Sequence, residues 1–358
     1  MLTALLVIAI LVFLIVVHEL GHFVAAKIFG VRVDEFGVGY PPRAFSFGRI
    51  GETEYTLNWI PFGGFVRLFG EEEEHGRGSL ADASRWKQAT ILIAGVSMNA
   101  IAAWLLFTGA YTLGILHPVQ SESTGSWLMV TDVVAGSPAA AAGIERGDEV
   151  VGVSDAYGSS PTLSPEAIVD FVRERPGKEL TVKYLRHGIS GNATLQPAHA
   201  VIHDEAGRPA IGLGLSRVTT EAMPISLALR AGFKLTITTF KAVFGGIVAI
   251  ARDVLVGSPN LRNVVGPIGI AGAVGQAAQN GWGYVLSLAA FISINLAIIN
   301  LIPIPALDGG RLLLIGIESL MQRRVSRLAL QSLNAIGIAL IILLMVTVTY
   351  QDIARLFT

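Results

Sequence analysis

The sequence predicts a polytopic α-helical membrane protein with four transmembrane helices, membrane-associated β-hairpins and an inserted α+β domain. Composition supports the membrane assignment, because 52% of the 358 residues are hydrophobic and 15% are charged, with a mean hydropathy of +0.59. Globular proteins usually contain about 25% charged residues. The helices follow from four long apolar stretches, and the inserted domain follows from short alternating strands between the second and third stretches.

The first apolar stretch covers residues 2–27 and contains His18, Glu19 and His22. It lacks the basic n-region and the cleavage site of a signal peptide, so we expect it to be retained. At 1.5 Å per residue it would measure about 39 Å, which exceeds the hydrocarbon core of about 30 Å. Three further long apolar stretches predict the other spans: 89–116, 282–304 and 328–350.

Between the first two spans, residues 31–70 alternate aromatic with small or polar residues and contain turn signals at PPR, GRIGE and PFGG. This pattern predicts short β-hairpins. The acidic run from Glu71 to Glu74 that follows predicts a solvated loop. A metal site formed by this run with His75 is the less favoured alternative.

Residues 118–218 predict a soluble domain, because five strand-like segments surround one helix-like segment, PEAIVDFVRER. The segment GSPAAAAGIERGDEVVGV places Gly143 and Gly147 at turns and Asp148 before a strand. This pattern resembles a PDZ domain, which implies a sheet edge that binds an extended peptide or a chain end. The predicted division is an N-terminal membrane half, the PDZ domain and a C-terminal membrane half, at 1–117, 118–218 and 219–358.

Residues 222–256 combine high apolar content with the basic residues Arg230, Lys234, Lys241 and Arg252. A helix in the membrane plane accommodates these charges better than a span does. The segment is therefore predicted to be an amphipathic in-plane helix.

Basic residues also predict the orientation of the chain. They are frequent between Lys27 and Lys87 and in the loop around Arg323 and Arg324, so both loops are expected to be cytoplasmic. Four spans satisfy this arrangement with the PDZ domain outside. A fifth span at 222–256 would put the last loop on the opposite side.

The HELGH segment has the spacing of a metal site. His18 and His22 are four residues apart, so on a helix they lie about 40° apart and can bind one ion. In an H-E-x-x-H segment the glutamate, here Glu19, acts as general base and not as a ligand. Zinc is the expected metal for histidine and carboxylate ligands with an open position. The alternative is polar pairing between helices, but ionisable groups in an apolar helix carry a desolvation cost of several kcal/mol.

A catalytic zinc site usually needs a third protein ligand, and a chain without cysteine has only His, Asp and Glu to provide it. Asp308 in NLIPIPALDGGRLL is the candidate. Pro303 and Pro305 break the preceding helix and free backbone groups that need protein or a wet cavity around them. The alternative is that Asp308 only caps the helix beginning there. Pairing with HELGH favours metal binding, because an unpaired carboxylate at that depth would need a cation.

Taken in order, HELGH, the FGVG and PFGGFV segments, the PDZ domain, GPIGI and NLIPIPALDGG resemble the site-2 protease family of intramembrane zinc metalloproteases, peptidase family M50. The resemblance covers essentially the whole chain. It implies one zinc ion per chain, bound by His18, His22 and Asp308, with Glu19 as catalytic base. It also implies that the substrate is held by residues ahead of the LDG motif, which correspond to Asn295, Asn300, Pro303 and Pro305.

Two features depart from the family pattern. Well-known members carry two tandem PDZ domains, whereas this chain has room for one. The segment AGVSMN lacks the proline that many relatives have after the glycine. Asn99 in that segment is kept, and no role is assigned to it here.

The resemblance implies an endopeptidase that cleaves single-span membrane proteins, such as anti-sigma factors or remnant signal peptides. The implied location is a bacterial inner membrane, with the active site near its cytoplasmic side. A net charge of −1 and the lack of a basic stripe give no indication of a nucleic-acid partner. The alternative function is a non-catalytic membrane scaffold or chaperone that presents a PDZ domain. A transporter is a third option, which no inverted repeat supports.

An intramembrane protease must bind its substrate in an extended conformation, whereas a helical substrate hides each amide in its own hydrogen bonds. We expect a hairpin edge, built from residues 36–40 and the TEYTLNW strand, to add the unwound substrate as a further strand. Ordinary cytoplasmic hairpins are the alternative.

Overall fold

The computed structural model describes residues 2–71, 75–119, 125–186, 188–199, 209–257, 265–323 and 325–355. The chain forms two compact units, one of residues 1–113 with 223–358 and one of residues 114–222. Most of the predicted acidic loop, Glu72 to Glu74, and the basic loop residue Arg324 lie outside the described residues.

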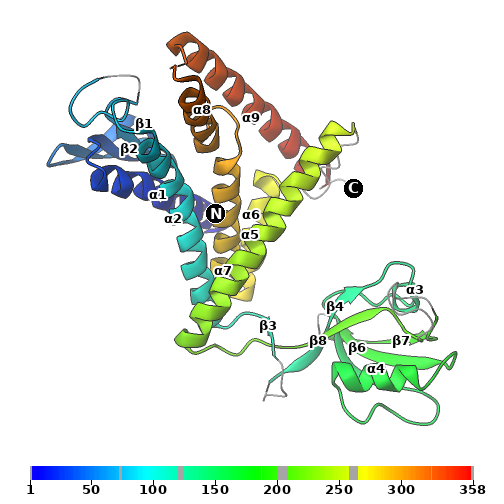
Figure 1. The fold of residues 1–358 in the computed structure, drawn as a ribbon. Helices are drawn as coiled ribbons and strands as arrows, with labels where there is room; N and C mark the ends of the chain where they lie inside the picture. The colour runs from blue at the N-terminus through cyan, green and yellow to red at the C-terminus, as the bar shows by residue number, and fades with distance from the viewer. Residues whose placement is uncertain are drawn as a thin grey trace. The chain divides into compact units, whose positions relative to one another are not determined.

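The first unit is a bundle of long helices with one small sheet (Figure 1). Its helix α2 packs against α1, α5, α7 and α8, and α6 packs against α1, α7 and α9. Helices α1 and α2 approach closely, since a Cβ on Gly21 would lie 2.9 Å from the Cα of Gly95. The helices are α1 (Leu2–Ile28), α2 (Arg85–Leu113), α5 (Ile225–Leu255), α6 (Pro267–Asn280), α7 (Trp282–Leu301), α8 (Asp308–Met321) and α9 (Arg327–Arg355).

Five described helices are long and apolar enough to cross a membrane: α1, α2, α5, α7 and α9. The structure therefore has one candidate span more than the four predicted, and the added helix is α5. Its four basic side chains are exposed, as the charge pattern predicts. Its other face packs on α2, where Trp104 donates to the carbonyl of Leu229 at 2.9 Å and stacks edge-on against Phe233. The basic residues report only on the exposed face of α5, whereas the contact with α2 depends on the opposite face.

Helix α6 begins at the predicted GPIGI segment and is capped by a side chain from α9. Asp352 is buried and accepts hydrogen bonds from the backbone N–H groups of Gly266 at 3.1 Å and Gly269 at 2.9 Å. A Cβ on Gly266 would lie 2.6 Å from the Asp352 carboxylate. The glycine therefore lets the cap approach the helix.

The predicted hairpins form a sheet of two long bent strands, β1 (Val33–Ile50) and β2 (Thr53–Leu68). The first half of β1 lies between two parts of β2, because Phe36 pairs with both Tyr55 and Val66. The second half of β1 pairs with the start of β2. Residues 64–68 therefore form an edge of the sheet, with no other described strand on their outer side.

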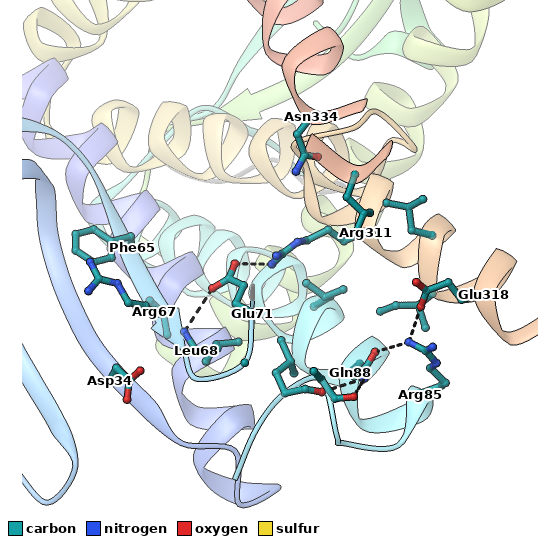
Figure 2. Close-up of a pocket in the computed structure, with 18 of the residues that line it drawn as sticks. Asp34, Phe65, Arg67, Leu68, Glu71, Arg85, Gln88, Arg311, Glu318 and Asn334 are labelled. Carbon is teal, nitrogen blue, oxygen red and sulfur yellow. Dashed lines mark hydrogen bonds and ion pairs between the residues drawn. The ribbon is translucent and has the colours of Figure 1, made fainter. Parts of the chain in front are cut away.

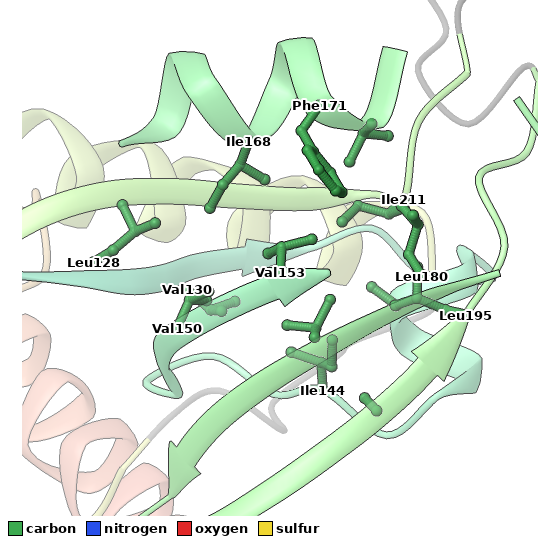
Figure 3. Packing of buried hydrophobic residues seen from close by; sticks show 14 residues of the cluster. Leu128, Val130, Ile144, Val150, Val153, Ile168, Phe171, Leu180, Leu195 and Ile211 are labelled. Atoms are coloured by element: carbon green, nitrogen blue, oxygen red, sulfur yellow. The ribbon is translucent and has the colours of Figure 1, made fainter. Parts of the chain in front are cut away.

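The second unit is an α+β domain with a six-stranded sheet in the order β3-β8-β4-β5-β6-β7. One buried hydrophobic cluster forms its core, in which Ile168 and Phe171 of α4 pack on the sheet (Figure 3). Ser164 caps α4. The elements are β3 (His117–Pro118), β4 (Trp127–Val133), α3 (Pro138–Ala141), β5 (Glu149–Ser154), α4 (Pro165–Arg173), β6 (Leu180–Arg186), β7 (Ile189–Leu195) and β8 (Leu213–Thr219).

The GIERGDEV segment of this PDZ-like domain forms the predicted turns. Gly143 and Gly147 have φ of 77° and 93°, which favours glycine. Asp148 is buried, accepts from the backbone N–H of Glu145 at 2.9 Å and pairs with Arg186 at 2.7 Å. The turn is therefore held by a buried carboxylate and a cation from β6.

Candidate metal centre

The two histidines of α1 meet the carboxylate of Asp308 at the start of α8. The Nε2 atoms of His18 and His22 lie 3.0 and 3.2 Å from the same Asp308 oxygen, and 3.0 Å from each other. Both histidines are buried. Within the described residues, this is the one cluster of three His, Asp or Glu side chains arranged to hold a metal ion.

Asp308 is brought there by a break between two helices. Helix α7 ends at Leu301 and α8 begins at Asp308, so the linker contains Pro303 and Pro305. Asp308 does not cap α8: the cap position is Leu307, without a side-chain hydrogen bond, and the carboxylate turns to the histidines instead. The capping alternative therefore does not account for this side chain.

Two glycines let α8 fold back tightly on the linker. A Cβ on Gly309 would collide with the carbonyls of Leu301 and Ile302, and one on Gly310 would collide with that of Ile304. In the LDGG sequence the candidate ligand Asp308 therefore comes directly before the two glycines whose close backbone contacts set its position.

Helix α2 orients both imidazole rings. His22 Nδ1 lies 2.8 Å from the carbonyl oxygen of Ile91, so this nitrogen carries the proton and Nε2 is free to act as a ligand. His18 Nδ1 lies 3.3 Å from the side-chain amide of Asn99. The Oδ1 atom of Asn99 is buried and has no hydrogen-bond partner. Turning the amide over brings this oxygen to the His18 Nδ1–H, and both Nε2 lone pairs then face Asp308.

These contacts fit a zinc ion. Ligands at about 2.0–2.1 Å in tetrahedral geometry lie about 3.3 Å from one another, close to the three distances between the candidate ligand atoms. Two Nε2 atoms at 3.0 Å need a shared proton or cation between them. The donor set of two imidazoles and one carboxylate is that of a catalytic zinc site, with a position left for water or substrate.

Gly95 leaves the room that the rings occupy. A Cβ there would collide with His22 Nε2 and would lie 2.8 Å from His18 Cε1. This glycine and the carbonyl of Ile91 were not identified from the sequence, and Asn99 had no predicted role. The available signal was a single Asn in an otherwise apolar stretch.

Glu19 lies between the histidines and the edge of the sheet. Its carboxylate accepts a hydrogen bond from the backbone of Val66. A Cβ on Gly64 would lie 3.7 Å from Glu19 Cγ. The candidate base therefore lies against residues 64–66 of the edge segment.

The predicted substrate residues lie in three places. Asn300 Nδ2 lies 3.4 Å from His18 Nε2, so this side chain is at the site. Asn295 donates to the carbonyl of Phe291 within α7 at 2.8 Å. Pro303 and Pro305 lie in the linker before Asp308.

The alternative acidic metal site has no such geometry among the described residues. His75 lies 2.6 Å from Asp82, and both side chains are exposed. Glu71 pairs with Arg311 at 2.6 Å.

The chain is similar to known proteins over almost its full length. The sequence model of peptidase family M50 matches residues 6–344. A Clostridium perfringens protein provisionally named a zinc metalloprotease is 34% identical over 95% of both chains. The regulator of sigma-W protease RasP of Bacillus subtilis is 28% identical over 96% of both. Among solved structures, the PDZ domain of an SdrC-like protein from Listeria monocytogenes matches 27% of this chain and 93% of that chain, with 21% identity and a TM-score of 0.21.

Proposed function

This chain belongs to peptidase family M50, and from that premise we propose that it is an intramembrane endopeptidase for single-span membrane proteins. As a family member it is a multi-pass membrane zinc metalloprotease that acts on proteins. The finer proposal is carried by one observation: His18 and His22 of α1, a helix apolar enough to span a bilayer, converge with Asp308 of α8. Such depth suits a substrate that is itself in the membrane.

We assign the site residues as follows. His18, His22 and Asp308 would hold zinc, which supplies polarisation of the scissile carbonyl and activation of a water molecule. Glu19 takes the proton of the attacking water and delivers it to the leaving nitrogen. The hydrogen bond from Val66 holds its carboxylate beside the histidines while the proton moves.

The edge segment 64–68 is the proposed substrate-binding strand. From the sequence, this role was expected of residues 36–40 and 53–59, but residues 36–38 pair on both sides and are interior. Residues 64–68 contact Glu19 through Val66, and their outer side is free of any described strand. An unwound substrate added there would satisfy its backbone groups next to the base. Asn300, beside His18, would contact the same extended peptide.

The proposed placement follows the charge distribution. The segment between α1 and α2 and the segment between α8 and α9 would be cytoplasmic, with the PDZ-like domain outside. This placement requires α5 to lie in the membrane plane and not to cross it. The metal site would then lie toward the cytoplasmic side of a bacterial inner membrane. The domain's sheet edge would bind a peptide or a chain end. Anti-sigma factors and remnant signal peptides are substrates of the expected kind.

Substitution of Glu19 by Gln tests the assignment. The purified variant should retain stoichiometric zinc, because Glu19 is not a ligand, and should cleave a reconstituted single-span substrate at least about 100-fold more slowly. Glu166→Gln on α4 is a matched control, expected to cleave at the normal rate. Substantial turnover by the Glu19 variant would contradict the mechanism. Absence of zinc from the unmodified protein would favour the scaffold instead.

A further inference from the structure

Helix α8 carries the ligand Asp308 but has little packing of its own. Of its fourteen residues, only Gly309 and Gly310 are buried. Leu313, Leu320 and Met321 are half or more exposed. The glycines fix the first turn against the linker, so some other contact must hold the rest of the helix.

One ion pair joins α8 to the sheet. Arg311, one turn after Asp308, donates to Glu71 Oε1 at 2.6 Å. The other oxygen of Glu71 accepts from the backbone N–H of Leu68 at 3.4 Å, at the end of the edge segment. Glu71 therefore links the proposed substrate-binding strand to the helix that carries the third ligand.

A second ion pair joins the far end of α8 to α2. Arg85, the first residue of α2, pairs with Glu318 at 2.6 Å. Glu318 also accepts from the backbone N–H of Val325, ahead of α9, at 2.9 Å. A cation at a helix N-terminus is unfavourable by itself, so Glu318 also compensates the charge of Arg85.

The two pairs cross the same cavity. Its volume is about 940 Å³, and it is lined by residues of β2, α2, α8 and α9, with both pairs drawn across it in Figure 2. Arg311 and Glu318 are seven residues apart, so they lie on one face of α8 about 10 Å apart along its axis. The face of α8 toward the cavity is therefore held by these two ion pairs, where apolar packing is sparse.

We propose that Arg311–Glu71 and Arg85–Glu318 form a two-point tether that positions Asp308 for metal binding. Arg311 and Glu318 act as positioning residues, through the orientation of α8. The tether rests on the proposed function only in that Asp308 is taken as a zinc ligand. The signs alternate along α8, positive at Arg311 and negative at Glu318, so a slip of the helix would break both pairs.

Charge reversal tests the tether without any substrate. Full-length protein loaded with zinc is mixed with an excess of chelator, and the rate of zinc loss is measured. Arg311→Glu places two carboxylates together and should accelerate zinc loss about tenfold, the lower range for residues that support a metal ligand. The double variant R311E/E71R restores opposite charges and should return the rate to within about twofold of normal. The reversals Arg85→Glu and Glu318→Arg, alone and together, should repeat the pattern.

Asp170→Arg is the matched control, because Asp170 forms an exposed pair with Arg173 on α4 in the other unit. It should leave zinc loss unchanged. If Arg311→Glu fails to fold, the neutral variant R311Q replaces it. A salt titration adds a second readout, because the Debye length falls from about 10 Å at 0.1 M to about 3 Å at 1 M. Zinc loss from the unmodified protein should accelerate with salt, and that of R311Q/E71Q should respond less.

Two outcomes would overturn the tether. In the first, the single reversals lose zinc at the normal rate while the unmodified protein binds zinc. In the second, the double reversal loses zinc as fast as the faster single variant. Failure of the unmodified protein to bind zinc would instead refute the proposed function, so the two failures are distinguishable.

Discussion

Gly95→Ala is expected to disable the metal centre through a single added methyl group. The new Cβ would lie 2.5 Å from His22 Cε1 and 2.8 Å from His18 Cε1. Carbon atoms ordinarily approach to about 3.5–4.0 Å, so the rings must move by about 1 Å. His22 has little freedom to move, because its Nδ1 is bound to Ile91 of the same helix α2. Misplacement of this size costs about 100-fold in rate.

The assay measures zinc affinity and cleavage of a single-span reporter by the reconstituted variant. We expect zinc affinity to fall about 10- to 100-fold and cleavage about 100-fold. Gly109→Ala is the control on the same helix, because its Cβ would lie 3.1 Å from the mobile end of Leu286. That variant should bind zinc and cleave normally. Normal zinc affinity in the Gly95 variant would refute the close packing described for α1 and α2.

Three further changes test the surrounding structure. Ala306 has φ of 74°, a left-handed conformation that costs free energy for any residue with a Cβ. After subtraction of the larger entropy that glycine loses on folding, Ala306→Gly should stabilise the protein by about 0.5 kcal/mol in denaturant titrations. A loss of stability would contradict this. Asp352→Ala removes both caps from α6 and should cost about 1 kcal/mol, seen as a lower thermal midpoint. Hydrogen bonds from the backbone of Tyr157 and then from Arg175 lower the pKa of Asp155 below its ordinary 3.8. The stability they confer is present above that value and is lost as the pH falls through the lower folded pKa. Asp155→Asn should therefore flatten the acid limb of the domain's unfolding curve, and an unchanged limb would contradict this.

The helices and the two histidines could be predicted because their signals are local. The spacing of His18 and His22 follows from the helix period alone, without knowledge of any other element. Asp308 required one further step, that a carboxylate at membrane depth needs a cation. That step identified a residue 290 positions away, and the structure brings it to both rings.

The orienting groups could not be predicted, because they depend on how α2 is rotated about its axis. The Ile91 carbonyl carries no signature in the sequence, and Asn99 gains its role only when it faces His18. The edge strand of the sheet could not be predicted either. Strand order is not local, and a β1 placed between two parts of β2 changes which residues are interior. For α5, the pattern of charges described one face and omitted the contact with Trp104.

The 290-residue separation between His18 and Asp308 has a consequence for biosynthesis. At about 5–20 residues per second, roughly 15–60 s pass between translation of the first ligand and of the third. During that interval α1 and α2, the first two candidate spans, are already made. The protease has no complete metal site until α8 is made and docks. With Asp308 as the proposed third ligand, its late synthesis delays activity, and we expect a nascent chain not to cleave the membrane proteins beside it.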